Sequence, residues 1–352
     1  MQRWKNNLYE FLKEQDFSKY EDFLKKHNNS SLFQSLVWRS MRKGQDFCAI
    51  IVKDKNENII GSIAIYIVNK YGKNLLFAPR GPVIDDGDEQ TLLELFKGIL
   101  ELAKKHNAYA LRFDPLIDRQ DINIANCIKK LNGKVLFVDD REIDSSPSHI
   151  VYLLNIEGKT NGEVFDSFDS QTRYKIRKCE KRNLVIKTGT KEDLKAFHNL
   201  FLQTTKRKGF NSRPLSYFQR LYDNLGEQYV HLKLAYFEGE LLGGALCLSY
   251  GKTTTYLYGA SCQKHRELMP NHLIQWNLIK WAIEKGFSTY SFGGIPGYKD
   301  EKNPAYGIYR FKKGFNGKIK EYIGEVNFVF KPFSYYLREK IVPFLRKINK
   351  LK

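Results

Sequence analysis

The sequence is poor in cysteine, and the cysteines that it has form no recognisable motif. Five of its 352 residues are cysteines, and no two of them make a CxxC pair: Cys48, Cys127, Cys179, Cys247 and Cys262. An odd, dispersed set argues against a disulfide framework or a cysteine zinc site and fits a reducing compartment. The seven histidines show no HExxH or similar spacing, so we expect no bound metal.

Long apolar runs are also absent. No segment reaches the about 18 uninterrupted apolar residues of a membrane-spanning helix. The first seven residues include no apolar run of the kind found in a secretion signal. We therefore expect a cytoplasmic protein, and we leave open a peripheral contact with the inner face of the membrane.

Acidic residues are outnumbered by basic ones. The sequence holds 58 Lys and Arg against 39 Asp and Glu, a formal net charge of +19. This excess favours a polyanionic partner, namely a nucleic acid, a nucleotide-linked substrate or an anionic membrane, with a merely solvated basic surface as the alternative. Hydrophobic residues make up 42% of the chain and aromatic residues 14%, which indicates a globular protein long enough for two domains.

Apolar patterns predict the same order of elements twice: a hairpin of two strands, a third strand, a helix and a fourth strand. In the first copy these are residues 47–52, 59–68, 75–78, 89–106 and 109–113; in the second they are residues 229–237, 241–250, 254–258, 272–285 and 289–292. The copies lie about 180 residues apart, which we interpret as a duplication.

Other segments lie before, between and after the two copies. A polar stretch at residues 141–148 is the best linker candidate and divides the chain into domains 1–145 and 149–317. Residues 34–42 are predicted to be a helix and residues 322–330 a single strand. The tail that follows is basic and amphipathic; it either packs as a closing helix on the first domain or lies on a membrane surface.

Hairpin, strand, helix, strand is the order of an N-acetyltransferase (GNAT) unit. We therefore expect an α/β protein with two tandem GNAT-like domains and mixed sheets. That fold usually holds the pyrophosphate of acetyl-CoA at a glycine-rich turn that opens the helix. Here the turn at residues 266–271 has no glycine, and Pro270 lacks an N–H donor. Residues 85–89 are acidic, so we expect an acyl donor other than CoA.

Residues 307–317 contain an aromatic residue, Phe311, directly before Lys312 and Lys313, with glycines at both ends. A ring can stack on a base and a cation can stabilise a developing oxyanion, so the segment is a candidate for a catalytic site. The alternative is a short helix with a solvated lysine pair and the phenylalanine in the core.

Two further patterns have a functional and a structural interpretation. Arg173 and Arg177 lie four residues apart in a basic predicted helix, which indicates either phosphate contacts or a solvated helix face. Asp114 ends a predicted strand; it could orient the reacting amine or act as a base, or it could be a turn residue before Pro115.

Taken in order, a series of short motifs resembles the Fem-type aminoacyltransferases, the FemABX family. The motifs are Gln34-x-x-x-Trp38, Leu111-Arg112-Phe113-Asp114-Pro115, Arg213-Pro214-x-x-Tyr217-Phe218, Tyr256-x-Tyr258-Gly259-Ala260, Met269-Pro270-Asn271, Phe311-Lys312 and Glu321-Tyr322-Ile323-Gly324-Glu325. No long charged heptad run occurs, so the chain is similar to compact members without the inserted helical arm. The resemblance also implies that the last segment, residues 318–352, returns to complete the first domain.

The resemblance implies transfer of an amino acid from aminoacyl-tRNA to the side-chain amine of residue three of the peptidoglycan stem peptide. The acceptor would be UDP-MurNAc-pentapeptide or lipid II, the product an interpeptide bridge, and aminoacyl-tRNA a co-substrate in place of a cofactor. We expect the enzyme to act as a monomer. The sequence leaves open which amino acid is transferred and whether the stem peptide carries lysine or diaminopimelate.

The resemblance also assigns residues. Phe311 and Lys312 match the pair that meets the aminoacyl-tRNA end, and residues that match the acceptor site are Tyr109, Arg213, Tyr217, Tyr256 and Tyr258. Arg42 stands where the family often has a phosphate-contacting lysine. Arg213 is a candidate for bidentate binding of phosphate or carboxylate, with a surface arginine that starts a helix as the alternative.

Two other classes of function remain as alternatives. One is a CoA-dependent N-acyltransferase on the same fold, and the other is a basic module that binds tRNA or membrane without catalysis.

Overall fold

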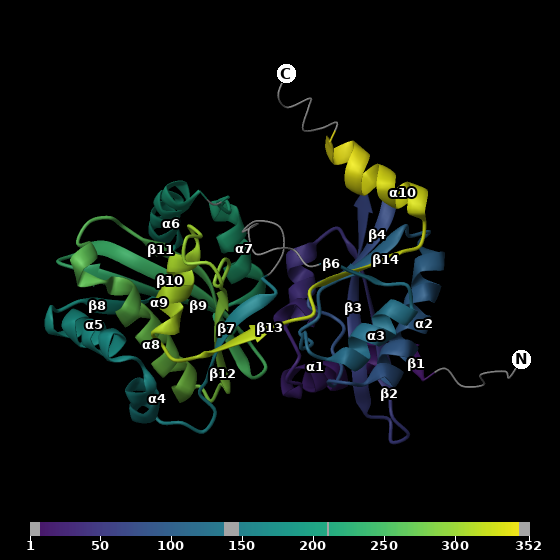
Figure 1. Ribbon diagram of the computed structural model, residues 1–352, viewed down its shortest axis with the longest axis horizontal. Helices are drawn as coiled ribbons and strands as arrows, with labels where there is room; N and C mark the ends of the chain where they lie inside the picture. The colour runs from purple at the N-terminus through teal and green to yellow at the C-terminus, as the bar shows by residue number, and fades with distance from the viewer. Residues whose placement is uncertain (1–7, 137–147, 210, 345–352) are drawn as a thin grey trace, which may run out of the picture. The chain divides into compact units, whose positions relative to one another are not determined.

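The computed structural model describes residues 8–136, 148–209 and 211–344, and the chain forms two compact units. One unit comprises Met1–Val138 with Tyr322–Lys352, and the other Asp139–Glu321. Each unit is a mixed sheet covered by helices (Figure 1). The predicted fold class, two tandem GNAT-like α/β domains, is therefore confirmed.

The first unit contains a seven-stranded sheet in which β4 and β5 are parallel and the other neighbours antiparallel. Its order is β1 (Tyr9–Phe11), β2 (Asp46–Lys53), β3 (Ile59–Lys70), β4 (Lys73–Ala78), β5 (Ala110–Phe113), β14 (Glu325–Val329) and β6 (Lys134–Leu136). The helices of this unit are α1 (Phe17–Lys26), α2 (Glu89–Lys105), α3 (Ile122–Lys130) and α10 (Pro332–Tyr336).

The second unit repeats this arrangement, with β11 and β12 as its parallel pair. Its order is β13 (Lys318–Glu321), β7 (Ile150–Asn155), β12 (Thr289–Gly294), β11 (Thr253–Ser261), β10 (Glu240–Tyr250), β9 (Val230–Phe237) and β8 (Val185–Gly189). The helices are α4 (Asn161–Ser167), α5 (Ser170–Lys181), α6 (Leu194–Lys208), α7 (Leu215–Leu225), α8 (Pro270–Glu284) and α9 (Tyr306–Lys313). When the second sheet is read from β8 to β13, its parallel pair occupies the fourth and fifth places, as β4 and β5 do in the first sheet. A duplication predicts this correspondence.

A glycine at the same point of each copy lets the long helix approach the sheet. A Cβ on Gly61 of β3 would lie 2.2 Å from Thr91 of α2, and a Cβ on Gly243 of β10 would lie 3.0 Å from Ile274 of α8. Any larger side chain would push the helix away from the apolar strands beneath it. The paired glycines thus belong to the packing of the repeat.

The two faces of the second sheet carry different helices. Gly243 faces α8, whereas the next residue, Gly244, faces Phe197 of α6, since successive residues of a strand point to opposite sides. The core beneath α5 and α8 includes Ile176, Cys247 and Ile279. Helices α6 and α7 cover the other face (Figure 1).

One prediction of secondary structure is wrong, and one strand is additional to those predicted. Residues 34–42 form parts of two 3₁₀ helices, η2 (Leu32–Gln34) and η3 (Val37–Arg42), in place of one α-helix. The strand predicted at residues 322–330 is present as β14 (Glu325–Val329), and the additional strand, β13, precedes it and pairs with β7 in the sheet of the second unit. Lys318–Glu321, predicted to belong to the first domain, therefore lies in the second unit. Most of the predicted linker lies outside the described residues.

Within the described residues, no helix has the length and apolar composition needed to cross a membrane.

Candidate active site

The candidate pair, Phe311 and Lys312, lies at the C-terminal end of helix α9. The two adjacent lysines, Lys312 and Lys313, differ in their exposure to solvent. The side chain of Lys312 is buried, with 6% of the residue exposed, while Lys313 is exposed. The Nζ of Lys312 donates a 2.7 Å hydrogen bond to the carbonyl oxygen of Gly294, the last residue of β12. It also lies 5.9 Å from the centre of the Tyr256 ring. The alternative of a solvated lysine pair therefore fails for Lys312.

Burial changes the charge of Lys312. Desolvation lowers the pKa of its ammonium group from 10.5 to about 7. Among the described residues, no carboxylate forms an ion pair with it. A buried cation without a carboxylate is costly for the free protein, so the arrangement is suited to a substrate that brings or develops negative charge there.

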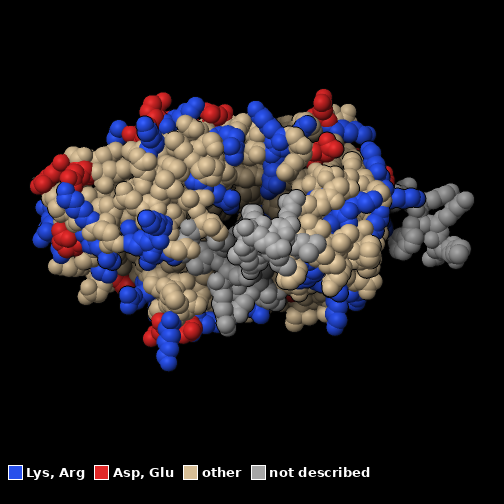
Figure 2. All heavy atoms as spheres, turned by 90° about the horizontal axis from the view of Figure 1, so that it is seen from above, with Lys and Arg blue, Asp and Glu red and all other residues tan. Residues whose placement is uncertain are grey.

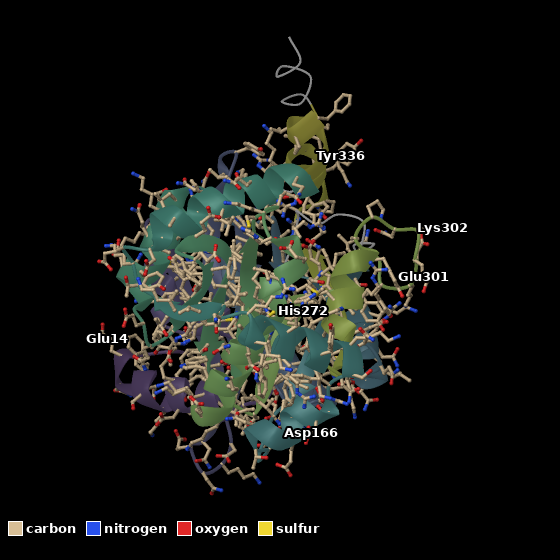
Figure 3. The ribbon with its side chains drawn as sticks, turned by 90° about the vertical axis from the view of Figure 1, so that its left-hand side faces the viewer. Glu14, Asp166, His272, Glu301, Lys302 and Tyr336 are labelled. Atoms are coloured by element: carbon tan, nitrogen blue, oxygen red, sulfur yellow. The ribbon has the colours of Figure 1, made fainter. Side chains whose placement is uncertain are left out.

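Phe311 is half-buried in an aromatic cluster. Its ring is 5.0 Å from the ring of His272 and 5.6 Å from that of Phe315, both edge to face. His272, the third residue of α8, is labelled in Figure 3 among the helices of the second unit. Burial, assisted by Lys175, lowers the pKa of His272 to about 4, so the imidazole is neutral at physiological pH.

Tyr258 belongs to a second cluster with Tyr217 and Arg213. The Tyr258 hydroxyl donates to that of Tyr217 over 3.3 Å, and the guanidinium of Arg213 lies 5.5 Å from the Tyr217 ring centre. Burial raises the pKa of the Tyr217 hydroxyl, which keeps it protonated and able to donate. Arg213 is exposed, and its carbonyl contacts His198 Nε2 at 2.9 Å.

A β-bulge places Tyr256 and Tyr258 on opposite faces of the sheet. Cys247 pairs with Tyr256 and the preceding Leu246 with Tyr258, so Leu257 has no partner in the ladder. Tyr256 consequently lies on the face of α8 with Lys312, and Tyr258 contacts Phe201 and Phe218 on the face of α6 and α7. The predicted residues of the second unit thus form two groups.

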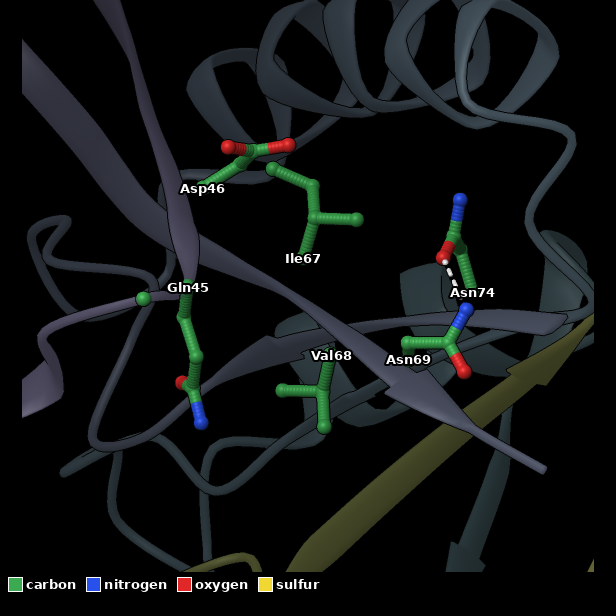
Figure 4. A pocket seen from close by; sticks show the side chains of 7 residues that line it. Gln45, Asp46, Ile67, Val68, Asn69 and Asn74 are labelled. Carbon is green, nitrogen blue, oxygen red and sulfur yellow. Dashed lines mark hydrogen bonds between the residues drawn. The ribbon is translucent and has the colours of Figure 1, made fainter. Parts of the chain in front are cut away.

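Arg42, in the first unit, lies over two aromatic rings. Its guanidinium is 5.3 Å from the Tyr66 ring centre and 5.1 Å from that of Phe77, and it donates to Gln45 over 3.3 Å. Gln45 lines a surface pocket of about 420 Å³ together with Gly44, Asp46, Ile67, Val68, Asn69 and Asn74 (Figure 4). The guanidinium of Arg42 is therefore held by two rings and Gln45, next to a polar pocket.

Tyr109 and Asp114 have partners within the protein. Tyr109 is fully buried and its hydroxyl donates to Glu339 over 2.7 Å. Asp114 is 3% exposed, accepts the backbone N–H of Arg80 over 2.7 Å and lies 3.6 Å from its guanidinium. Desolvation raises the pKa of Asp114, with Arg80 opposing the shift. These contacts favour the interpretation of Asp114 as a turn residue.

Sequence reasoning did not assign a role to Gly294 or His272. Gly294 contributes a main-chain carbonyl, which the identity of a residue does not reveal. His272 had a weak signal, since it follows Pro270 at the start of a helix, but its contact with Phe311 depends on how α9 packs.

The helix starts that bind CoA in other GNAT folds are occupied here by the protein's own groups. At α8, the N–H of His272 bonds to the carbonyl of Met269, and that of Leu273 is directed to the sulfur of Cys179. At the start of α2, the N–H of Thr91 donates to the side chain of the N-cap residue Asp88 over 2.9 Å. Within the described residues, no group of three or more His, Cys, Asp or Glu could hold a metal ion.

Comparisons with known proteins show the family and the fold of the chain. The sequence model of the FemAB family matches residues 16–240 and 237–341. The lipid II:glycine glycyltransferase of Staphylococcus aureus strain USA300 is 27% identical over 401 residues, covering 93% of this chain and 95% of that protein. The enzyme of the same name from a Staphylococcus epidermidis strain is 27% identical over 396 residues with the same coverage.

Solved structures give the same result. The crystal structure of FemX has a TM-score of 0.85 and 26% identity, covering 94% of this chain and 100% of that one. A tandem GNAT protein from the clavulanic acid biosynthesis pathway has a TM-score of 0.55 at 11% identity, covering 91% of this chain and 98% of that one. This second likeness concerns the fold alone. The alignment of 401 residues exceeds the 352 of this chain, so the staphylococcal relatives contain residues without a counterpart here.

Proposed function

This chain belongs to the FemAB family of aminoacyltransferases, and from that premise we propose that it transfers an amino acid from aminoacyl-tRNA to the peptidoglycan stem peptide. The acceptor group is the side-chain amine of residue three, and the product is the start or the extension of an interpeptide bridge. The names of the staphylococcal relatives support a lipid-linked acceptor, lipid II.

The observation that carries the proposal is the environment of Lys312. Its ammonium group is buried against the Gly294 carbonyl and the Tyr256 ring, and its pKa is lowered to about 7. A purely structural lysine would be expected to reach solvent or a carboxylate. Lys312 is instead held where a negative charge on a bound substrate would restore a normal pKa.

The chemistry needs little more than such a site. An aminoacyl ester is already activated, so the main task is to hold the acceptor amine against the ester carbonyl. Negative charge then develops on the carbonyl oxygen and the departing ribose oxygen. Lys312, in its protonated form, stabilises this charge, and the half-buried ring of Phe311 is the candidate to stack on the terminal adenosine.

A phosphate or carboxylate of the acceptor, remote from its reacting amine, is assigned to the cluster of Arg213, Tyr217 and Tyr258, on the other face of the sheet from Lys312. The exposed guanidinium of Arg213, oriented by the Tyr217 ring, suits a phosphate or a carboxylate. Arg42, beside the polar pocket of Figure 4, is the corresponding candidate in the first unit. The excess of Lys and Arg over the face drawn in Figure 2 supports a polyanionic donor such as tRNA.

The two alternatives have less support. A CoA donor would find N–H groups at the N-termini of α8 and α2 already bonded to Met269, Cys179 and Asp88. A module that only binds tRNA or membrane has no need for a buried lysine without a carboxylate partner.

Single-turnover transfer tests the proposal. The protein is mixed with a tRNA pool charged with labelled amino acids and, in separate tubes, with lipid II or UDP-MurNAc-pentapeptide. Label on either acceptor identifies both the acceptor and the amino acid. Label that moves only from acetyl-CoA in a control tube would overturn the donor assignment and leave the fold assignment intact.

A further inference from the structure

The last described helix, residues 332–344, is fixed to the first unit by two side chains, Glu339 and Tyr335, and the Tyr335 ring lies 6.4 Å from that of Tyr109. It consists of α10, the π-helical turn η5 (Leu337–Ile341) and three more helical residues. Glu339 accepts hydrogen bonds from Tyr109 (2.7 Å), Lys70 (2.8 Å) and Arg112 (3.1 Å). These partners lower the pKa of Glu339 against the opposing effect of burial, so the anchor is ionised.

The opposite side of the helix exposes large apolar side chains. Phe333 is 81% exposed, Tyr336 59%, Ile341 37% and Phe344 64%. Phe333 has the highest exposure of any large apolar residue in the described part of the chain. Spacings of three, five and three residues, across a π turn, keep these side chains on the side away from Glu339. Figure 3 labels Tyr336 on this helix.

The charge of the segment favours one kind of occupant. From Lys331 to the end of the sequence, Glu339 is the single acidic residue. Its negative charge is balanced by Lys70 and Arg112, which donate hydrogen bonds to it. The basic residues in the same stretch are Lys331, Arg338, Lys340, Arg346, Lys347, Lys350 and Lys352. A second copy of a chain with net charge +19 would bring like charges together. Exposed aromatics among basic residues are instead typical of a helix at the interface of an anionic bilayer.

We propose that residues 332–344 dock the protein on an anionic membrane surface, with Phe333, Tyr336 and Phe344 inserted among the lipid headgroups and Glu339 holding the helix to the domain. The proposal deepens the proposed function and rests on it for the choice of acceptor, because a docked enzyme meets lipid II in the plane of the membrane.

The first test measures binding to vesicles. Full-length protein is sedimented with vesicles of phosphatidylcholine alone or mixed with phosphatidylglycerol. We expect binding to the anionic vesicles that weakens with added salt. The double variant Phe333→Ser/Phe344→Ser should lower the partition coefficient by about tenfold or more. The matched control, Ile122→Ser/Val185→Ser, removes residues that are 70% and 61% exposed elsewhere and should bind as the unaltered protein does.

The second test separates docking from catalysis. The Phe333→Ser/Phe344→Ser variant should transfer to lipid II in anionic vesicles about tenfold more slowly, while transfer to the water-soluble UDP-MurNAc-pentapeptide stays unchanged. An unaltered melting temperature shows that the variant is folded. Vesicle binding without transfer to either acceptor would reject the proposed function and keep the docking.

Two outcomes would overturn the docking proposal. One is equal partition of the unaltered protein and the Phe333→Ser/Phe344→Ser variant. The other is a dimer in solution that this variant dissociates, which would make the face an interface between copies of the chain.

Discussion

The Nζ of Lys312 lies 2.7 Å from the carbonyl oxygen of Gly294 and donates a hydrogen bond to it. One residue comes from helix α9 and the other from the end of strand β12, so the contact fixes the lysine at the carboxyl end of an interior strand of the second sheet. The neighbouring Lys313 is exposed. Adjacent residues of the same type thus provide a test residue and its control.

Replacement of Lys312 should lower the rate of the chemical step. Lys312→Ala removes a cation that stabilises the developing oxyanion, and we expect single-turnover transfer to slow by about 10²–10³-fold, as for the loss of one oxyanion donor. Lys313→Ala should stay within about twofold of the unaltered enzyme, since a solvated lysine contributes little. Equal rates for both variants would exclude the assigned role of Lys312.

The lowered pKa of Lys312 predicts a pH dependence of stability. Between about pH 7, the pKa in the folded protein, and pH 10.5, the ordinary value, the unfolded chain binds the additional proton. The free energy of unfolding should therefore rise with pH in this window, by up to about 1.4 kcal/mol per pH unit. Urea denaturation at pH 7 and pH 9 measures the change, and Lys312→Met should have a smaller one. The same slope in both proteins would show that Lys312 titrates normally.

Gly259 should be required for the position of Tyr256. A Cβ on Gly259 would lie 1.7 Å from the Tyr256 hydroxyl oxygen, so Gly259→Ala must displace that ring from Lys312. We expect Gly259→Ala and Tyr256→Leu to slow transfer by similar factors, and the double variant to be no slower than either. Fully additive losses, measured by single-turnover kinetics, would mean that the two positions act independently.

Arg213 should contribute to acceptor binding. Arg213→Ala removes a charged contact on the exposed side of the Tyr217 ring, and we expect KM for the acceptor to rise about tenfold or more with little change in kcat. The control is Arg220→Ala, because Arg220 is an exposed arginine of α7, the helix that follows Arg213. A fall in kcat with unchanged KM would place Arg213 at the reacting centre.

The basic face of α5 should contact tRNA through only some of its side chains. Arg173 donates to the carbonyls of Asp166 and Phe168, and Arg177 lies 5.2 Å from the Phe165 ring centre, so both already have partners on α4 or directly after it. Lys178→Glu/Lys181→Glu should weaken tRNA binding and reduce its salt dependence by about one unit per lost phosphate contact.

Lys129→Glu/Lys130→Glu, on α3 of the first unit, makes the same change of charge elsewhere. If it weakens tRNA binding equally, the effect is one of net charge and α5 is not a specific contact.

The sequence by itself determined the duplication. The same order of apolar strands and a helix of period 3.6 recurs in the sequence. Each of these patterns reflects local geometry that the residues themselves impose. The short motifs then identified the family. For Phe311, Lys312 and Arg213 the sequence offered a short helix and a helix-starting arginine only as alternatives, and these local positions match α9 and the start of α7.

Only the tertiary structure decided which of these residues meet. A bulge at Leu257 sends Tyr256 and Tyr258 to opposite faces, although a regular strand would place residues two apart on the same side. Lys312 is buried and Lys313 exposed because α9 packs against the end of β12. Tyr109 lies beneath a helix 230 residues away in sequence, through its bond to Glu339. Such contacts depend on how distant segments pack, and no local pattern in a sequence contains that information.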